Sequence, residues 1–239
     1  MKFRIAAVLP LVIALLLPAA WGQQQAAGNA SAQQHISALK QAMAANRQKL
    51  MKYQWLQSTE VSVKGKVRKD QRMECRYGAD GKVVKTPIGP DASGQAQEAP
   101  RGIRGKVVAK KKEEMQDYTD RLKSLISNYA PPDPEMIKTS KLAGNGSLNA
   151  SGGIVTLSFA DYYKPGDKIS FGFDRAAKKL VSYDVNTYLD DPKNDIVTMT
   201  NRFATLPDGT SYLRQTVVNS NSKQIQITTT NSDYTPLSQ

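Results

Sequence analysis

The residue types that carry most enzyme chemistry are scarce in this chain. The single histidine, His35, lies close to a Gln- and Ala-rich stretch, where no rigidly held catalytic base is expected. The single cysteine, Cys75, alternates with Met73 and Tyr77, which places it on one face of a strand as a buried thiol. One histidine and one cysteine cannot supply the usual ligands of a zinc site, and one cysteine excludes an internal disulfide.

The carboxylates form no recognisable catalytic pair. Asp190, Asp191 and Asp195 share one segment and would hold calcium weakly at most, since their spacing fits no EF-hand and Asp-Asp-Pro is ordinary turn chemistry. Gly144-Asn145-Gly146 lacks the third glycine of a dinucleotide loop. We therefore expect no enzyme, no metal and no cofactor. Four further acids are out of phase with the apolar strand positions and are expected in solvent: Glu60, Glu74, Asp174 and Asp184.

Basic residues cluster at 101–112, where six of twelve residues are Lys or Arg, and the chain carries a formal net charge of +12. Such a charge favours anionic partners, including a membrane surface. Nucleic acid is not expected, because no aromatic residue for base stacking lies between Tyr77 and Tyr118. A solvated loop that binds nothing is the alternative. The candidate contacts to an anionic head group are Arg104, Lys110, Lys111 and Lys112.

The first 22 residues have the pattern of a secretory signal peptide. A positive start at 1–4 precedes an apolar run at 5–19, and Ala20-Trp21-Gly22 offers small residues at the cleavage positions. The apolar run is shorter than the about 20 residues of a membrane span. We expect cleavage near Gly22, a disordered leader at 23–34, and a mature protein in the periplasm or secreted from the cell.

Hydrophobic spacing predicts two amphipathic helices, at about 31–53 and at 108–130. Asp133-Pro134 resembles an N-cap followed by proline in the first turn, which predicts a short third helix over Pro134 to Leu142. Residues 87–107 are rich in proline and glycine and are expected to form a flexible basic linker.

Alternating apolar and polar residues predict about nine antiparallel strands. Three run from Trp55 to Thr86, and six run from Val155 to Ile227, between turn signals such as Asp80-Gly81. A twisted sheet of this size curls, and its apolar face must be covered. We predict an α+β fold in a single domain over 35–235, in which a curved antiparallel sheet, an incomplete barrel, is covered by two to three helices.

Aromatic side chains recur on the predicted inner face of this sheet. In a closed core they would simply pack against one another. Beneath helices that move, they would line a groove for an acyl chain, which would replace Leu122, Leu125 and Ile126 when the second helix is displaced. The candidate groove residues are Tyr53, Trp55, Leu122, Leu125, Ile126, Phe159, Phe171, Phe173, Tyr183 and Phe203.

The order of elements resembles the LolA/LolB-like group of periplasmic lipoprotein carriers over most of the mature chain. Local stretches that add to the resemblance are Tyr53-Gln54-Trp55, Tyr77-Gly78-Ala79-Asp80-Gly81, the segment 203–209 and Asn231-Ser232-Asp233-Tyr234. The resemblance implies an incomplete barrel whose helices shelter the lipid chains of a lipoprotein. The basic linker and the high charge depart from that group, and none of Arg68, Arg72 and Arg76 can be matched to its functional arginine.

These observations favour an exported, monomeric, non-enzymatic protein that binds a lipid or lipoprotein acyl chain between sheet and helices. The alternative is a cell-envelope interaction protein with a closed core and a basic surface for anionic polymer or head groups. The first hypothesis predicts bound lipid, whereas the second predicts no lipid and a steep dependence of binding on salt.

Overall fold

The computed structural model describes residue 41, residues 44–89 and residues 103–237. The predicted signal peptide, the leader, His35 and the start of the predicted first helix lie outside the described residues. Residues 44–50 are helical, and β1 (Tyr53–Val63) begins shortly after them. The first helix therefore ends before Tyr53, because the two-residue period of the strand already starts there.

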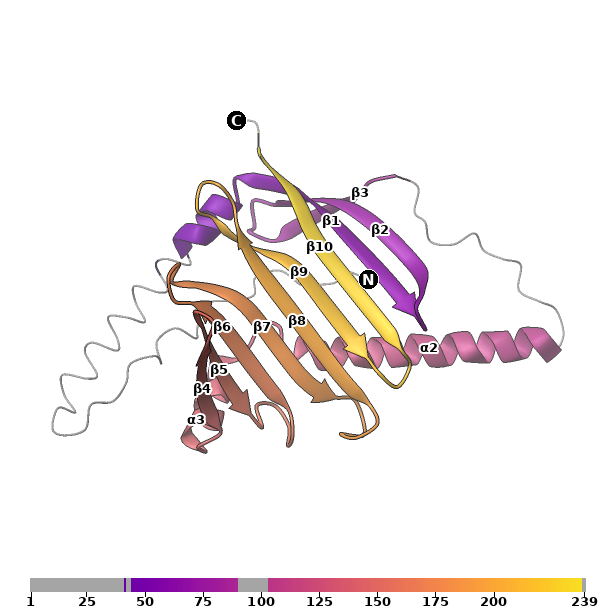
Figure 1. Cartoon of the computed structure of the whole chain (residues 1–239). Coiled ribbons are helices and arrows are strands. Elements are labelled where there is room, and N and C mark those ends of the chain that lie inside the picture. The colour runs from indigo at the N-terminus through magenta and orange to yellow at the C-terminus, as the bar shows by residue number, and fades with distance from the viewer. Residues whose placement is uncertain (1–40, 42–43, 90–102, 238–239) are drawn as a thin grey trace.

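Ten strands form one antiparallel sheet in the order β3-β2-β1-β10-β9-β8-β7-β6-β5-β4 (Figure 1). After β1 these are β2 (Lys66–Tyr77), β3 (Val83–Pro87), β4 (Gly146–Ser151), β5 (Ile154–Ala160), β6 (Lys168–Asp174), β7 (Lys179–Tyr188), β8 (Ile196–Thr205), β9 (Ser211–Ser220) and β10 (Ile225–Pro236). The sheet stays open because its edges, β3 and β4, do not pair with each other. This arrangement confirms the predicted fold class of a curved antiparallel sheet with helices.

The strand that sequence analysis missed is β4. All six of its residues are exposed, so no apolar alternation marks it. Backbone pairing with β5 defines it instead, from Gly146 opposite Phe159 to Ser151 opposite Ile154.

Helices α2 (Ile103–Ser127) and α3 (Pro134–Leu142) lie between β3 and β4 in the chain. The prediction for α3 is confirmed: a carboxylate oxygen of Asp133 accepts a hydrogen bond from the Glu135 amide at 2.9 Å, and Pro134 stands in the first turn. Helix α2 starts at Ile103 rather than at 108, so the last part of the predicted linker is helical. Residues 90–102 of that linker lie outside the described residues.

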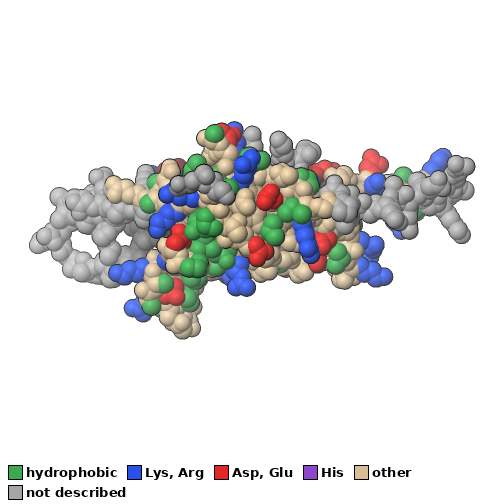
Figure 2. Space-filling model, turned by 90° about the horizontal axis from the view of Figure 1, so that it is seen from above, with side chains coloured by type: hydrophobic (Ala, Val, Ile, Leu, Met, Phe, Trp, Pro, Cys, Tyr) green, Lys and Arg blue, Asp and Glu red, His purple; other side chains and the backbone are tan. Residues whose placement is uncertain are grey.

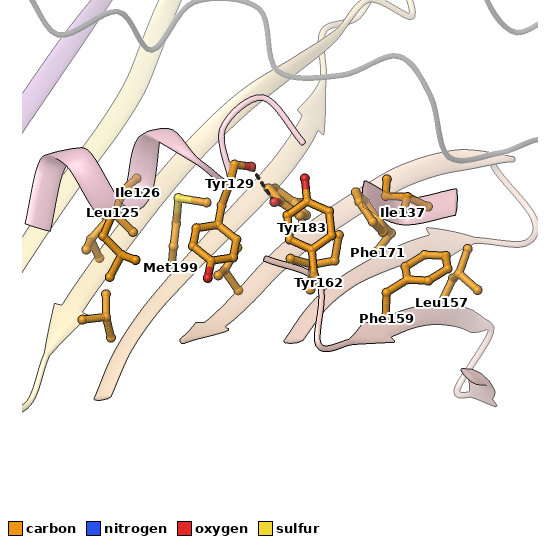
Figure 3. Close-up of a cluster of buried hydrophobic side chains, with 14 of the residues drawn as sticks. Leu125, Ile126, Tyr129, Ile137, Leu157, Phe159, Tyr162, Phe171, Tyr183 and Met199 are labelled. Atoms are coloured by element: carbon orange, nitrogen blue, oxygen red, sulfur yellow. Dashed lines mark hydrogen bonds between the residues drawn. The ribbon is translucent and has the colours of Figure 1, made fainter. Parts of the chain in front are cut away.

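The main hydrophobic core lies between the helices and one face of the sheet, which we call the inner face (Figure 3). Strand register places Phe159, Ile169, Val185 and Met199 in one row on this face. The opposite, outer face is polar. Arg202 and Asp184 form an ion pair there at 2.6 Å, and the four acids expected in solvent all lie on that face at exposed or half-buried positions.

Candidate functional site

The inner face is sealed where β5 to β8 meet the helices. Phe159, Phe171 and Tyr183 are at most 1% exposed, and the rings of Phe171 and Tyr183 stack with their centroids 4.8 Å apart. Side chains of α2 fill the space above them, so the groove predicted for this region is occupied by the core. The predicted groove residues that come together here are Leu122, Leu125, Ile126, Phe159, Phe171, Phe173 and Tyr183, with Phe203 at the border.

Two tyrosines anchor the helical segment to the sheet. The hydroxyl of Tyr118 donates to Asp195 at 2.7 Å and lies 2.5 Å from the hydroxyl of Ser220. The hydroxyl of Tyr129, just past the end of α2, donates to Asp167 at 2.5 Å. Burial is the main cause that raises the pKa of both tyrosines, so both hydroxyls remain protonated and can donate.

Asp167 is a buried carboxylate, 1% exposed, whose oxygens are fully engaged. Besides the Tyr129 hydroxyl, it accepts hydrogen bonds from the backbone amides of Tyr162 at 2.6 Å, Tyr163 at 3.0 Å and Lys164 at 3.0 Å. A buried charge is tolerated when hydrogen bonds replace its hydration in this way. Asp167 therefore joins the β5–β6 connection to the end of the helical segment.

Burial of the inner face decreases from β5 towards β2 along one row of paired residues. The row members on β5 to β9, from Phe159 to Val218, are at most 8% exposed. The next two members, Ile227 on β10 and Val61 on β1, are only half-buried, and Lys69 on β2 is exposed. The described helices thus leave this part of the inner face only partly covered.

We call the inner face of β10, β1 and β2 the open strip. Its half-buried apolar residues are Val61, Val63, Met73 and Ile227. Between them the hydroxyls of Thr59 and Thr229 lie 3.3 Å apart, within hydrogen-bonding distance of each other. The strip therefore combines half-buried apolar side chains with polar ones, and it is not sealed; Gln71 and the exposed Lys69 lie on its β2 side.

An aromatic group ends the open strip where β1 begins. The Trp55 ring stacks on Tyr234 with centroids 5.4 Å apart and lies 5.5 Å from Tyr77. Trp55 therefore belongs to a cluster separate from the main core. Tyr53 donates its hydroxyl to Asp208 at 3.0 Å at the surface. These two predicted groove residues are not brought together with the other eight.

Helical residues 44–50 lie against this end of the sheet. The Asn46 side chain exchanges two hydrogen bonds with the backbone of Ser211, at 2.8 and 2.9 Å, and Arg47 donates to the Gly81 carbonyl at 3.0 Å. Figure 2 views the molecule from this end and shows patches of hydrophobic side chains between Lys and Arg side chains.

Lys85 of β3 lies beside the aromatic group on the inner face, opposite Cys75 of β2. Its ammonium donates to the side-chain oxygen of Gln57 at 2.5 Å. The Gln57 amide nitrogen donates in turn to the side-chain oxygen of Asn231 at 2.9 Å, which also accepts from the Trp55 indole at 3.2 Å. This network holds a lysine in place through neutral groups.

The groups around Lys85 are uncharged rather than acidic. Burial lowers the pKa of Lys85, and burial raises the pKa of Cys75 to about 11, so the facing thiol is neutral at physiological pH. Within the described part of the chain, no carboxylate forms an ion pair with Lys85.

The residues predicted to contact a head group lie elsewhere. Lys110, Lys111 and Lys112 are exposed on the N-terminal half of α2, which extends beyond the sheet in Figure 1. Arg104 belongs to the same helix, but its side chain lies outside the described set. These residues are not brought together with Lys85.

The aspartates that share the β7–β8 connection do not converge. Asp190 pairs with Arg121, Asp191 accepts from the Lys193 amide at 2.8 Å, and Asp195 accepts from Tyr118. Over residues 44–89 and 103–237, no group of three His, Cys, Asp or Glu side chains is placed to hold a metal ion. The described helices include none that is long and apolar enough to cross a membrane. A shallow pocket of about 380 Å³ opens on the outer face and is lined mainly by small polar residues such as Thr198.

Sequence reasoning missed Lys85, Gln57 and Asn231. A signal for Lys85 existed, because it falls in phase with Val83 on its strand and therefore points inward. The network itself joins residues more than 170 positions apart and has no local signal.

No protein-family model matches this chain, and no curated protein matches its sequence. Two solved structures are similar. One is a LolA superfamily protein from Nitrosomonas europaea, 8% identical, with a TM-score of 0.36 over 83% of this chain and 94% of that one. The other is a DUF1329 family protein from Desulfovibrio piger, 12% identical, with a TM-score of 0.38 over 82% of this chain and 92% of that one. The chain therefore resembles the LolA superfamily only weakly, and this resemblance assigns no function.

Proposed function

We propose that this protein binds an acyl chain, as part of a lipid or lipoprotein, on the open strip of the inner face. The observation that carries the proposal is the decrease in burial along one row of paired residues, from Phe159 at 1% exposed to the half-buried Ile227 and Val61. A soluble domain normally covers such a face, so a partly open apolar face suits an apolar ligand.

The dimensions of the open strip suit an extended chain. From Gln57 to Val63 the strand spans about 20 Å, at about 3.3 Å per residue. Val61, Val63 and Ile227 supply apolar contacts along this length, and the hydroxyls of Thr59 and Thr229 lie within hydrogen-bonding distance of each other. Covering these side chains would gain about 25 cal/mol for each Å² of apolar surface removed from water.

The ligand occupies the open strip without displacing α2. Removing α2 would expose Leu122, Leu125 and Ile126, at a cost of about 1.5–3 kcal/mol for each side chain. It would also break the hydrogen bonds of Tyr118 and Tyr129 to buried aspartates. Occupation of the open strip avoids both costs, so it precedes any helix displacement.

The proposal includes export and a non-enzymatic role. The signal-peptide pattern of residues 1–22 supports a location in the periplasm or outside the cell. A protein that shields acyl chains in an aqueous compartment needs an apolar face and no catalytic group.

The first test is mass spectrometry of an organic extract from the protein, purified from its native compartment without detergent. A stoichiometric lipid or lipopeptide is expected. The matched variants are Val61→Asp, which puts a charge on the open strip, and Ser62→Asp, which puts the same charge on the outer face next to it. Loss of lipid in the first variant alone would support the proposal; equal lipid content in both folded variants would refute it.

A second candidate function is supported by the sealed core over β5 to β8 and by the exposed lysines 110–112 of α2. In this hypothesis the protein binds anionic polymer or head groups in the cell envelope through its basic surface. It predicts an empty organic extract and an affinity that falls steeply with salt.

A further inference from the structure

We propose that Lys85 binds the anionic group of the ligand, so that the open strip accepts an anionic amphiphile with a carboxylate or phosphate at one end. This inference rests on the proposed function and adds the chemical class and the orientation of the ligand. The anionic end lies at β3 beside the aromatic group, and the apolar chain runs along β1 towards α2.

The hydrogen bonds around Lys85 hold its ammonium ready for a ligand. An ammonium has three donors, and the structure uses one of them, to the side-chain oxygen of Gln57 at 2.5 Å. The Gln57 amide nitrogen is committed to Asn231, which fixes the direction of the Gln57 oxygen. Asn231 is fixed in turn because its own amide donates to the Leu213 carbonyl at 2.8 Å. Two ammonium donors remain for an anion.

The charge of Lys85 has no counter-charge of its own. Among residues 44–89 and 103–237 the ion pairs involve other lysines and arginines, and Cys75, which pairs with Lys85 across the strands, is a neutral thiol at physiological pH. Taking a cation partly out of water without an anion is unfavourable. The lowered pKa of Lys85 reflects this cost, which a bound carboxylate or phosphate would remove.

The open strip continues from Lys85 along β2 and β1 through apolar and uncharged polar residues. Met73 lies next to Cys75 on the same face of β2, opposite Gln57 of β1. From Gln57 the inner face of β1 continues through Thr59 to Val61 and Val63. The apolar side chains of Met73, Val61 and Val63 thus follow Lys85 along the strip, as an amphiphile with one charged end requires. The exposed Lys69 lies at the margin of the strip beside Val61.

The test is isothermal titration calorimetry on the delipidated protein with four probes. Laurate and dodecyl phosphate carry a chain and an anion, dodecanol carries the chain alone, and inorganic phosphate carries the anion alone. We expect the wild-type protein to bind laurate and dodecyl phosphate at least tenfold more tightly than dodecanol, and to bind inorganic phosphate much more weakly than either. Lys85→Met should abolish the preference for the anionic chains and leave dodecanol binding unchanged.

Lys82→Met is the matched control, because Lys82 is exposed in the same hairpin and pairs with Asp80. It should keep the preference. Gln57→Glu provides a test that retains Lys85: the new carboxylate pairs with the ammonium and should also abolish the preference. This variant decides the matter if circular dichroism shows that Lys85→Met is unfolded.

The outcomes separate the two proposals. If the wild-type protein binds laurate and dodecanol equally, the role of Lys85 is refuted while acyl-chain binding stands. If neither is bound, the proposed function itself fails. If inorganic phosphate bound as tightly as dodecyl phosphate, the site would be one for a free anion, and the proposal of an amphiphilic ligand would be refuted.

Discussion

The hydroxyl of Tyr129 donates to the carboxylate of Asp167 at 2.5 Å, and both side chains are at most 1% exposed. The Tyr183 hydroxyl donates to the Tyr129 carbonyl at 2.6 Å, so side chain and backbone of Tyr129 are both held (Figure 3). This contact fixes the end of the helical segment to the sealed half of the sheet.

Tyr129→Phe should lower the free energy of unfolding by about 1–3 kcal/mol, because it removes a buried donor from Asp167 and a partner from Thr187. Urea denaturation followed by circular dichroism measures this. Tyr188→Phe is the control, since its hydroxyl bonds the Pro165 carbonyl at an exposed position, and its change should stay within about 0.5 kcal/mol. Equal losses in both variants would contradict a special role for the Tyr129–Asp167 contact.

Hydrogen exchange should show that α2 keeps its place when the ligand binds. Saturation with laurate is expected to leave the backbone amides between Tyr118 and Tyr129 as protected as before, and to increase protection on β1 around Val61. The reason is that the open strip is free of α2, whereas the sealed half is not. Loss of protection in α2 would indicate helix displacement instead.

Binding of an anionic chain should weaken as the pH rises. Lys85 must be protonated to bind the anion, and its pKa lies below the ordinary value of 10.5. Affinity for laurate is therefore full below the pKa of Lys85 in the free protein and is lost as the pH rises through it, earlier than for an exposed lysine. Calorimetry from pH 7 upwards measures this.

The titratable groups that face Lys85 on β2 are Cys75 and Tyr77, and burial raises the pKa of both. They therefore stay neutral while Lys85 loses its proton, and they do not obscure the trend. Dodecanol binding serves as the control and should not change over the same range. An identical pH profile for the two probes would argue against Lys85.

The lysines of α2 should not be needed for binding of the acyl chain and should matter only for binding to anionic surfaces. Replacing Lys110, Lys111 and Lys112 together with alanine should leave laurate affinity unchanged, because these side chains are exposed and distant in the fold from Lys85. Co-sedimentation with anionic vesicles at rising salt checks the other role. If the triple variant lost laurate binding, the placement of the ligand on the open strip would be wrong.

The sequence predicts those elements whose signals are local. Helix α3 has an N-cap and a proline in its first turn, and it occupies the predicted residues. The apolar phase of these strands places Phe159, Phe171 and Tyr183 on the inner face, where the structure buries them. Strand β4 has no such phase, and only its pairing with β5 reveals it.

The candidate site was predicted in part, because its geometry depends on distant pairings. The aromatic residues on the inner face were identified, but Trp55 lies in a separate cluster from Phe171, since β1 pairs with β10 at the far side of the sheet. Lys85 acquires its position only when β3 joins β2 and Gln57 meets Asn231. The local sequence around Lys85 does not predict those contacts.

Helix α2 is also a lever. Tyr118 lies about 14 Å along the axis from Ser127, the last residue of α2, and the helix continues for roughly another 22 Å to Ile103, at 1.5 Å per residue. With Ser127 as the pivot, a force on the basic N-terminal end acts on the Tyr118 hydrogen bonds with a mechanical advantage of about two to three. Such a force is therefore carried first by the contact beside the β9–β10 turn, where Ser220 and Ser222 share the Tyr118 hydroxyl with Asp195.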